Sequence, residues 1–155
     1  MQIEVTESTT IARPAWEVRG RFRDITFHAG NPVHGVGVSV LQRRGGRCRY
    51  LSSVQLGPFV VDHEVVMTEE EDGSLRHVAR QGRFAGAVTT CHFDALSPEA
   101  TQITLTATVP IPALWRPIGP LLRRWLARTL RRALDQERAD LEAQPVMRLI
   151  HPSLL

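Results

Sequence analysis

The feature that most constrains this chain is a run of six strand-like segments between residues 36 and 109, separated by turns too short to hold a helix. The segments are rich in β-branched residues, which favour strands. The turn signals between them are Gly45-Gly46, Leu56-Gly57-Pro58, Asp72-Gly73, Gln81-Gly82 and Ser97-Pro98-Glu99. Because parallel neighbours need a crossover of a dozen or more residues, this succession predicts an antiparallel meander.

Helical patterns and one further strand flank the meander. Residues 2–11 predict a strand, residues 15–22 predict a helix after Pro14, and residues 24–37 predict a short helix or loop. No Gly or Pro occurs between Pro120 and Pro145, and one apolar stripe runs through that stretch. It predicts an amphipathic helix of about 24 residues, the one predicted element long enough to cover the sheet.

These elements predict an α+β fold in a single domain over residues 1–145, followed by a tail over 146–155. The long C-terminal helix would lie across a sheet of seven antiparallel strands, with two short helices after the first strand. The chain of 155 residues is long enough for one hydrophobic core.

Composition limits the classes of function. All 19 basic residues are Arg, yet they are not interleaved with exposed aromatic residues and no recognition motif accompanies them, so we expect no nucleic-acid partner. Two cysteines, Cys48 and Cys91, do not indicate a disulfide framework and fit a reducing compartment. With no pattern of a signal peptide or membrane span, we expect a cytoplasmic protein.

Three stretches carry a resemblance to a known family. Residues 11–18 (Ile-Ala-Arg-Pro-Ala-Trp-Glu-Val), Asp24 followed by Asn31-Pro32, and residues 101–106 running through Pro110 into the long helix are similar to motifs of the helix-grip superfamily SRPBCC. This superfamily includes START lipid-transfer domains, polyketide cyclases and coenzyme Q-binding proteins. The resemblance implies a sheet curled round the helix, with an apolar cavity between them that binds a hydrophobic small molecule. The family often has Trp where this chain has Cys91.

Strand alternation predicts which side chains face that cavity. Val61, His63, Val65 and Met67 share one face of a strand. A two-residue turn at Asp72-Gly73 would pair Met67 with Val78 and Val65 with Arg80, and a turn at Gln81-Gly82 would then direct Ala85 inward. The same faces continue through Ala87, Thr89, Cys91 and Phe93 and through Ile103, Leu105, Ala107 and Val109. If the first turn is longer, the directions of Arg80 and His77 stay open.

The predicted ligand-binding set combines these strand residues with one wall of the long helix. From the strands it comprises Val61, His63, Val65, Met67, Arg80, Ala87, Thr89, Cys91, Phe93, Leu105 and Ala107. From the helix it comprises Leu122, Trp125, Leu126, Thr129 and Leu130. His63, Arg80 and Thr89 would orient a polar end of the ligand, while His63 and Arg80 retain structural interpretations as a satisfied core histidine and a solvent-reaching side chain.

No constellation of catalytic or metal-binding residues stands out. His63 and Glu64 are adjacent on a strand and therefore point to opposite faces, which excludes a dyad. The spacing of His28, His34 and His63 fits no common zinc pattern, so we expect no metal and no cofactor. Cys91 has no base placed beside it by the sequence, and we interpret it as cavity wall.

The long helix also carries an arginine stripe, formed by Arg123, Arg124, Arg128, Arg131, Arg132 and Arg138. One interpretation is a solvated face balanced by the acidic residues further along the helix. The other is transient contact with an anionic membrane surface, with Trp115 at the interface and the protein peripheral at the inner membrane face.

We therefore expect binding or transport of a lipid, isoprenoid, quinone or polyketide-like compound in an internal cavity. Two alternatives stay open. One is a cyclase- or dehydratase-type enzyme with His63 as general acid or base, and the other is a non-catalytic interaction module with a filled cavity. The sequence predicts neither the ligand nor the oligomeric state.

Overall fold

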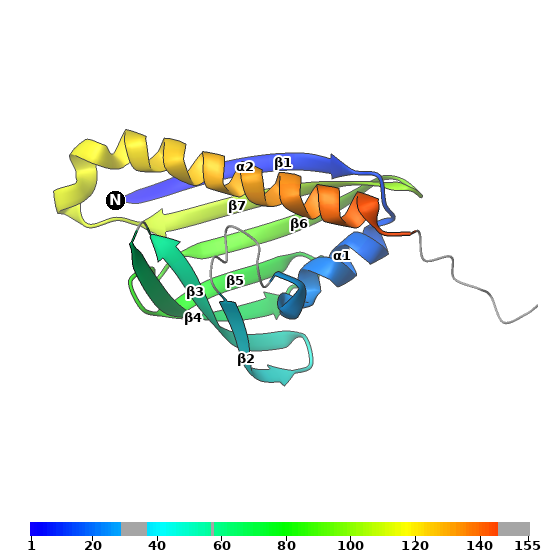
Figure 1. Ribbon diagram of the computed structural model, residues 1–155, viewed down its shortest axis with the longest axis horizontal. Coiled ribbons are helices and arrows are strands. Elements are labelled where there is room, and N and C mark those ends of the chain that lie inside the picture. Colours follow the sequence, from blue (N-terminus) through cyan, green and yellow to red (C-terminus); the bar gives the residue numbers. More distant parts are fainter. Residues whose placement is uncertain (29–36, 57, 146–155) are drawn as a thin grey trace, which may run out of the picture.

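The computed structural model describes residues 1–28, 37–56 and 58–145 and shows an antiparallel sheet with the helices on one face (Figure 1). The seven strands lie in the order β1-β7-β6-β5-β4-β3-β2. Their bounds are β1 Gln2–Ile11, β2 Gly37–Arg44, β3 Arg47–Leu56, β4 Phe59–Glu69, β5 Leu75–Gln81, β6 Val88–Ser97 and β7 Ala100–Pro110. The α+β helix-grip fold expected from the sequence is confirmed.

Two α-helices and two short 3-10 helices complete the described chain. They are α1 Ala15–Arg23, η1 Ile25–His28, η2 Ala113–Ile118 and α2 Gly119–Ala143. Proline sets both α-helix starts, since Pro14 directly precedes α1 and Pro120 lies in the first turn of α2. The sequence did not predict η2. Among the described residues, no helix is both long and apolar enough to cross a membrane.

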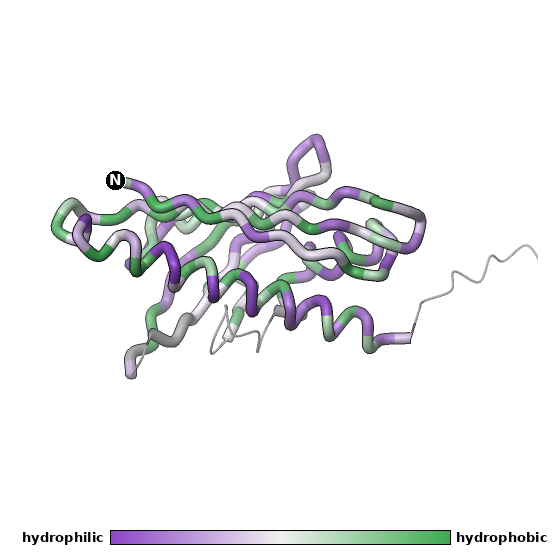
Figure 2. The backbone as a smooth tube through the Cα atoms, turned by 90° about the horizontal axis from the view of Figure 1, so that it is seen from above, coloured by the Kyte–Doolittle hydropathy of each residue, from purple (hydrophilic) through white to green (hydrophobic). Residues whose placement is uncertain are grey.

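The helix α2 runs lengthwise beside β1, as the ribbon and the tube viewed from above both show (Figures 1 and 2). Its C-terminal half buries Leu134 and Leu141 in the main core with Ile11 and Ile103. Its N-terminal half packs Leu130 in a second cluster. Each fully buried leucine contributes about 1.5–3 kcal/mol relative to exposure, so this apolar stripe holds the helix against the β1–β7 side of the sheet.

The hairpin between β2 and β3 confirms the two-residue turn at Gly45-Gly46, because Arg44 pairs with Arg47. Gly45 has a φ of +56°, which glycine adopts without strain. On β7 the predicted inner face is confirmed, with Ile103, Leu105 and Ala107 buried.

The predicted register between β4 and β5 is wrong by one residue. Met67 pairs with His77 and Val65 with Ala79, instead of with Val78 and Arg80. The connecting turn holds the five residues 70–74, and the Asp72 carboxylate accepts hydrogen bonds from the backbone N–H and hydroxyl of Ser74, at 2.9 and 2.6 Å. The longer turn brings His77 onto the inner face and leaves Arg80 exposed.

The predicted start of the sixth strand is also wrong. β6 begins at Val88 rather than at Phe84, because a loop closed by backbone hydrogen bonds between Ala79 and both Gly86 and Ala87 precedes it. Ala85 is therefore exposed in that loop and does not face inward. Within β6, the residues predicted to face inward do so, because Cys91 is buried and Phe93 packs against the core.

Candidate functional site

The predicted ligand-binding residues differ widely in burial. Six are buried in the core: Val65, Met67, Cys91, Leu105, Ala107 and Leu130. Eight are half-buried: Val61, His63, Ala87, Thr89, Phe93, Leu122, Leu126 and Thr129. Arg80 and Trp125 are exposed. Contact of any of them with a ligand stays a prediction. Asn31, Pro32, His34 and the tail 146–155 lie outside the described residues.

Polar side chains lie among apolar ones on the inner face of β3 and β4. There Cys48 pairs with Met67, Tyr50 with Val65 and Ser52 with His63. We call this surface the β3–β4 face and define it by Cys48, Tyr50, Ser52, Val61, His63, Val65 and Met67. Side chains of directly opposed residues have Cβ atoms about 4.5–5.5 Å apart, so Ser52 and His63 are immediate neighbours.

Two buried polar atoms on the β3–β4 face have no hydrogen-bond partner among the described residues: the hydroxyl oxygen of Ser52 and Nδ1 of His63. Ser52 is 1% exposed, and its hydroxyl is its sole polar side-chain group. Unpartnered buried atoms also occur in Glu17 and Arg19, but each of those side chains forms an ion pair through another of its atoms. An unsatisfied buried polar group costs about 1–3 kcal/mol. Stability of the fold therefore does not explain why Ser52 and His63 occupy these positions.

His63 lies in a largely apolar environment. The ring of Phe84 meets it edge-on with 5.5 Å between ring centroids. Gly82 makes this contact possible: its φ of +95° turns the loop back, and a side chain there would collide with the backbone oxygen of Asp62. Burial lowers the pKa of His63, partly offset by a hydrogen bond to the Val61 backbone and by the Asp62 charge, so the site favours the neutral ring over the charged one.

A second polar pair lies next to the first. The Tyr50 hydroxyl and Nδ1 of His77 are 3.0 Å apart, and the two rings meet edge-on. Burial strongly raises the pKa of Tyr50, with further contributions from Cys91 and Cys48, so the phenol keeps its proton. Burial likewise raises the pKa of the Cys91 thiol to about 12, which argues against Cys91 as a nucleophile.

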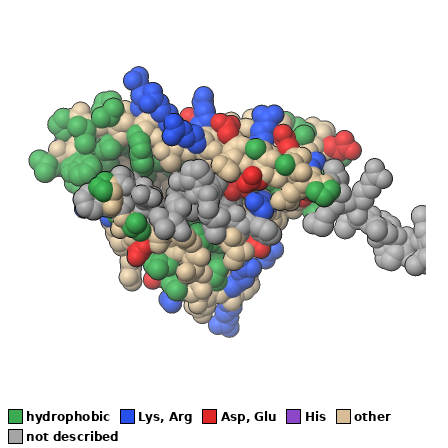
Figure 3. All heavy atoms as spheres, in the orientation of Figure 1, with side chains coloured by type: hydrophobic (Ala, Val, Ile, Leu, Met, Phe, Trp, Pro, Cys, Tyr) green, Lys and Arg blue, Asp and Glu red, His purple; other side chains and the backbone are tan. Residues whose placement is uncertain are grey.

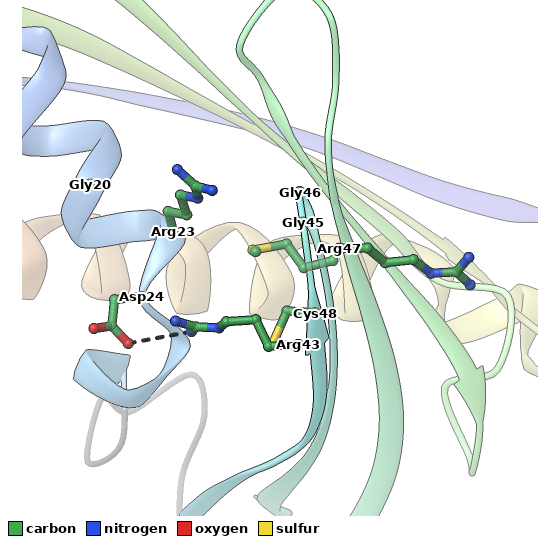
Figure 4. Close-up of a pocket in the computed structure, with 9 residues that line it drawn as sticks. Gly20, Arg23, Asp24, Arg43, Gly45, Gly46, Arg47 and Cys48 are labelled. Atoms are coloured by element: carbon green, nitrogen blue, oxygen red, sulfur yellow. Dashed lines mark ion pairs between the residues drawn. The ribbon is translucent and has the colours of Figure 1, made fainter.

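One end of the β3–β4 face, at Cys48 and Met67, borders a hollow of about 340 Å³ next to the end of α1 (Figure 4), and Ser52 and His63 do not line it. Cys48 and Met67 belong to its lining, and Arg23, Asp24 and Arg43 line it on the polar side. Arg43 reaches toward Asp24, with 3.7 Å between Nη2 and Oδ1, while Arg47 points away from them. Hydrogen bonds from Thr26 lower the pKa of Asp24, with Arg43 contributing.

A smaller hollow of about 250 Å³ lies nearer the start of α1, lined by Ala15, Trp16, Arg19, Asp72, Gly73 and Phe93. Neither hollow is lined by a residue of α2. The predicted cavity wall of Leu122, Leu126 and Leu130 instead packs with residues of β1 and β7. Whether these helix residues contact a ligand stays a prediction.

Solved structures share this architecture over nearly the whole chain. Protein TTHA0849 from Thermus thermophilus is 20% identical with a TM-score of 0.78, over 91% of this chain and 99% of that one. A START superfamily protein from Mycobacterium smegmatis is 16% identical with a TM-score of 0.73, over 90% and 99%. The Zhui aromatase/cyclase from Streptomyces sp. R1128 is 14% identical with a TM-score of 0.66, over 92% and 90%.

The chain has the START-like helix-grip fold. No protein-family model and no curated protein matches the sequence. At these identities the likeness establishes the fold, and the chemistry has to be argued from the residues of this chain.

Sequence reasoning missed three residues of the site. Ser52 carries no signal beyond its alternation with Tyr50, and the sequence interpretation did not assign an inner face to β3. Phe84 was placed in a strand, whereas the glycines on either side of its loop could have indicated a turn. His77 depended on the length of one turn, and the Asp72-Gly73-Ser74 sequence is typical of a carboxylate-capped loop.

Proposed function

We propose that the protein binds a hydrophobic small molecule carrying one neutral polar group, such as a hydroxyl, and that this molecule lies on the β3–β4 face. The observation that carries the proposal is the pair of unpartnered buried atoms, the Ser52 hydroxyl and His63 Nδ1. A hydroxyl between them would give each a hydrogen-bond partner. The lowered pKa of His63 favours an uncharged group over an anion as its partner.

The surroundings supply the apolar part of the binding energy. Val61 and Phe84 are half-buried beside the polar pair, and Met67 continues the surface into the hollow of about 340 Å³. That volume is at the lower end for small-molecule sites. Each Å² of apolar ligand surface removed from water stabilises the complex by about 25 cal/mol. The likeness to a START protein and an aromatase/cyclase supports this class of ligand by analogy of fold.

A matched pair of probes tests the proposal: 2-naphthol, which has a hydroxyl, and naphthalene, which lacks it. We expect the full chain to bind 2-naphthol about tenfold more tightly, measured by fluorescence titration. Ser52→Ala and His63→Phe should each remove most of that preference and leave naphthalene binding unchanged.

Ser53→Ala provides the matched control, because Ser53 is the next residue on β3 and donates its hydrogen bond to Asp62 on the other face, at 2.6 Å. Equal affinities for the two probes in the unmodified protein would refute the proposed polar anchor. So would an effect of Ser53→Ala as large as that of Ser52→Ala.

A cyclase- or dehydratase-type enzyme remains the second candidate, and the Tyr50–His77 contact favours it by placing a second proton donor and acceptor on the same face. Native mass spectrometry of protein purified with its copurifying ligand separates the two. A carrier holds the same compound in the unmodified protein and in His63→Gln, whereas an enzyme with His63 as acid or base accumulates its substrate in the variant.

A further inference from the structure

Large apolar side chains are exposed where η2 leads into α2. They gather at one end of the molecule (Figure 3) and comprise Leu114, Trp115, Ile118, Leu121 and Trp125, which we call the apolar end. Leu114 is 86% exposed and Leu121 68%, more than any other large apolar residue described. A contiguous patch of this kind marks a surface that another body covers.

The sequence in and after the apolar end is rich in arginine and free of acidic residues. Six arginines and no acidic residue occur between residues 116 and 134: Arg116, Arg123, Arg124, Arg128, Arg131 and Arg132. Arg131 pairs with Glu7, with 2.8 Å between Nη2 and Oε2. The other five make no ion pair with a described residue. The first acidic residue of α2 is Asp135. The arginines that have no acidic residue near them in the sequence therefore lie in the half of the helix that carries the apolar end.

The helical spacing joins these two features into one face. Leu121, Trp125, Arg128 and Arg132 follow one another at steps of four, three and four, which places them on the same side of α2. Leu126 and Leu130 on the opposite side pack against the sheet. The helix therefore presents apolar side chains first and arginines directly after them, along one outward surface.

We propose that this surface docks on an anionic lipid bilayer, with the apolar end inserted into the interface and the arginines over the headgroups. The arginines favour a bilayer over a second copy of this chain as the partner of this surface. Anionic headgroups would neutralise the unpaired arginines, whereas a second copy would bring the same positive charge against them. Tryptophan and leucine beside arginine are typical of helices that lie in a bilayer surface. The proposal uses none of the residues of the β3–β4 face and stands or falls independently of ligand binding there.

Flotation of the full chain with vesicles tests this surface. We expect the protein to float with vesicles of phosphatidylcholine and phosphatidylglycerol and to remain below with pure phosphatidylcholine. Arg124→Gln/Arg128→Gln should lower the partition coefficient about fivefold for each arginine removed, and raised salt should have the same direction of effect. Leu114→Ser/Leu121→Ser should abolish flotation, and since both leucines are exposed, the fold should be retained.

Matched controls lie on the sheet. Arg76→Gln/Arg80→Gln removes two exposed charges from β5, and Val60→Ser/Leu96→Ser removes two exposed apolar side chains. Both should float like the unmodified protein. Failure of the unmodified protein to float, or an equal loss in the controls, would overturn the proposal. So would a dimer in sedimentation that Leu114→Ser/Leu121→Ser dissociates, since that result assigns the apolar end to a second copy.

Discussion

Two regions of the inner face bury polar side chains in opposite ways. At the packed end, which we define by Ile11, Arg13, Thr101, Leu134 and Leu141, polar atoms have partners. The Thr101 hydroxyl donates to the backbone oxygen of Arg13 at 2.8 Å, and Nε of Arg13 donates to the backbone oxygen of Leu141 at 3.1 Å. These bonds tie the end of α2 to the sheet.

On the β3–β4 face the Ser52 hydroxyl and His63 Nδ1 have no such partners among the described residues. Since a valine or alanine would fill the position of Ser52 at lower cost, folding does not account for the hydroxyl there. The comparison teaches that buried polarity serves stability at the packed end, and it points to binding on the β3–β4 face.

The largest expected effect is the difference in the free energy of unfolding between a truncated side chain at the packed end and one on the β3–β4 face. Leu134 is 1% exposed, and Leu134→Ala should reduce the free energy of unfolding by about 3 kcal/mol, because it removes buried methyl groups and leaves a cavity. Val61→Ala, at a half-buried position of the β3–β4 face, should cost less than about 1 kcal/mol. Urea unfolding followed by circular dichroism measures both, and similar losses would show that Val61 is packed as tightly as Leu134.

Deletion of two hydroxyl groups sharpens the same contrast. Thr101→Val removes a buried donor and leaves the Arg13 oxygen without it, so we expect a loss of about 1–2 kcal/mol. Ser52→Ala removes a hydroxyl that has no partner among the described residues, so stability should stay within about 0.5 kcal/mol or rise. Thermal and urea unfolding of the two variants side by side is the measurement. A loss at Ser52 that equals the loss at Thr101 would mean that the Ser52 hydroxyl has a structural partner.

The sequence predicted the packed end well, because its signals are local and redundant. Proline marks the start of each α-helix, and an uninterrupted apolar stripe marks the buried face of α2. On β7, alternation identified Ile103, Leu105 and Ala107 as inner residues without knowledge of any partner strand.

The β3–β4 face was predicted less completely, because its composition depends on turn length. A five-residue turn in place of a two-residue turn shifts β5 by one position, which exchanges Arg80 for His77 on the inner face. The alternation on β4 still identified His63, while its neighbours Ser52 and Phe84 come from another strand and from a loop. Such contacts are nonlocal, and no period in the sequence encodes them.

The smallest expected effect is a pH dependence that belongs to His63. Burial lowers its pKa in the folded protein below the ordinary value of 6.5 that applies in the unfolded chain. Between these two values the unfolded chain binds more protons, so the folded protein loses stability as the pH falls below about 6.5. In His63→Gln this contribution is absent. Melting temperatures of both proteins between pH 7.5 and about 5 should therefore converge or cross as the pH falls, and parallel curves would place His63 in a solvated environment instead.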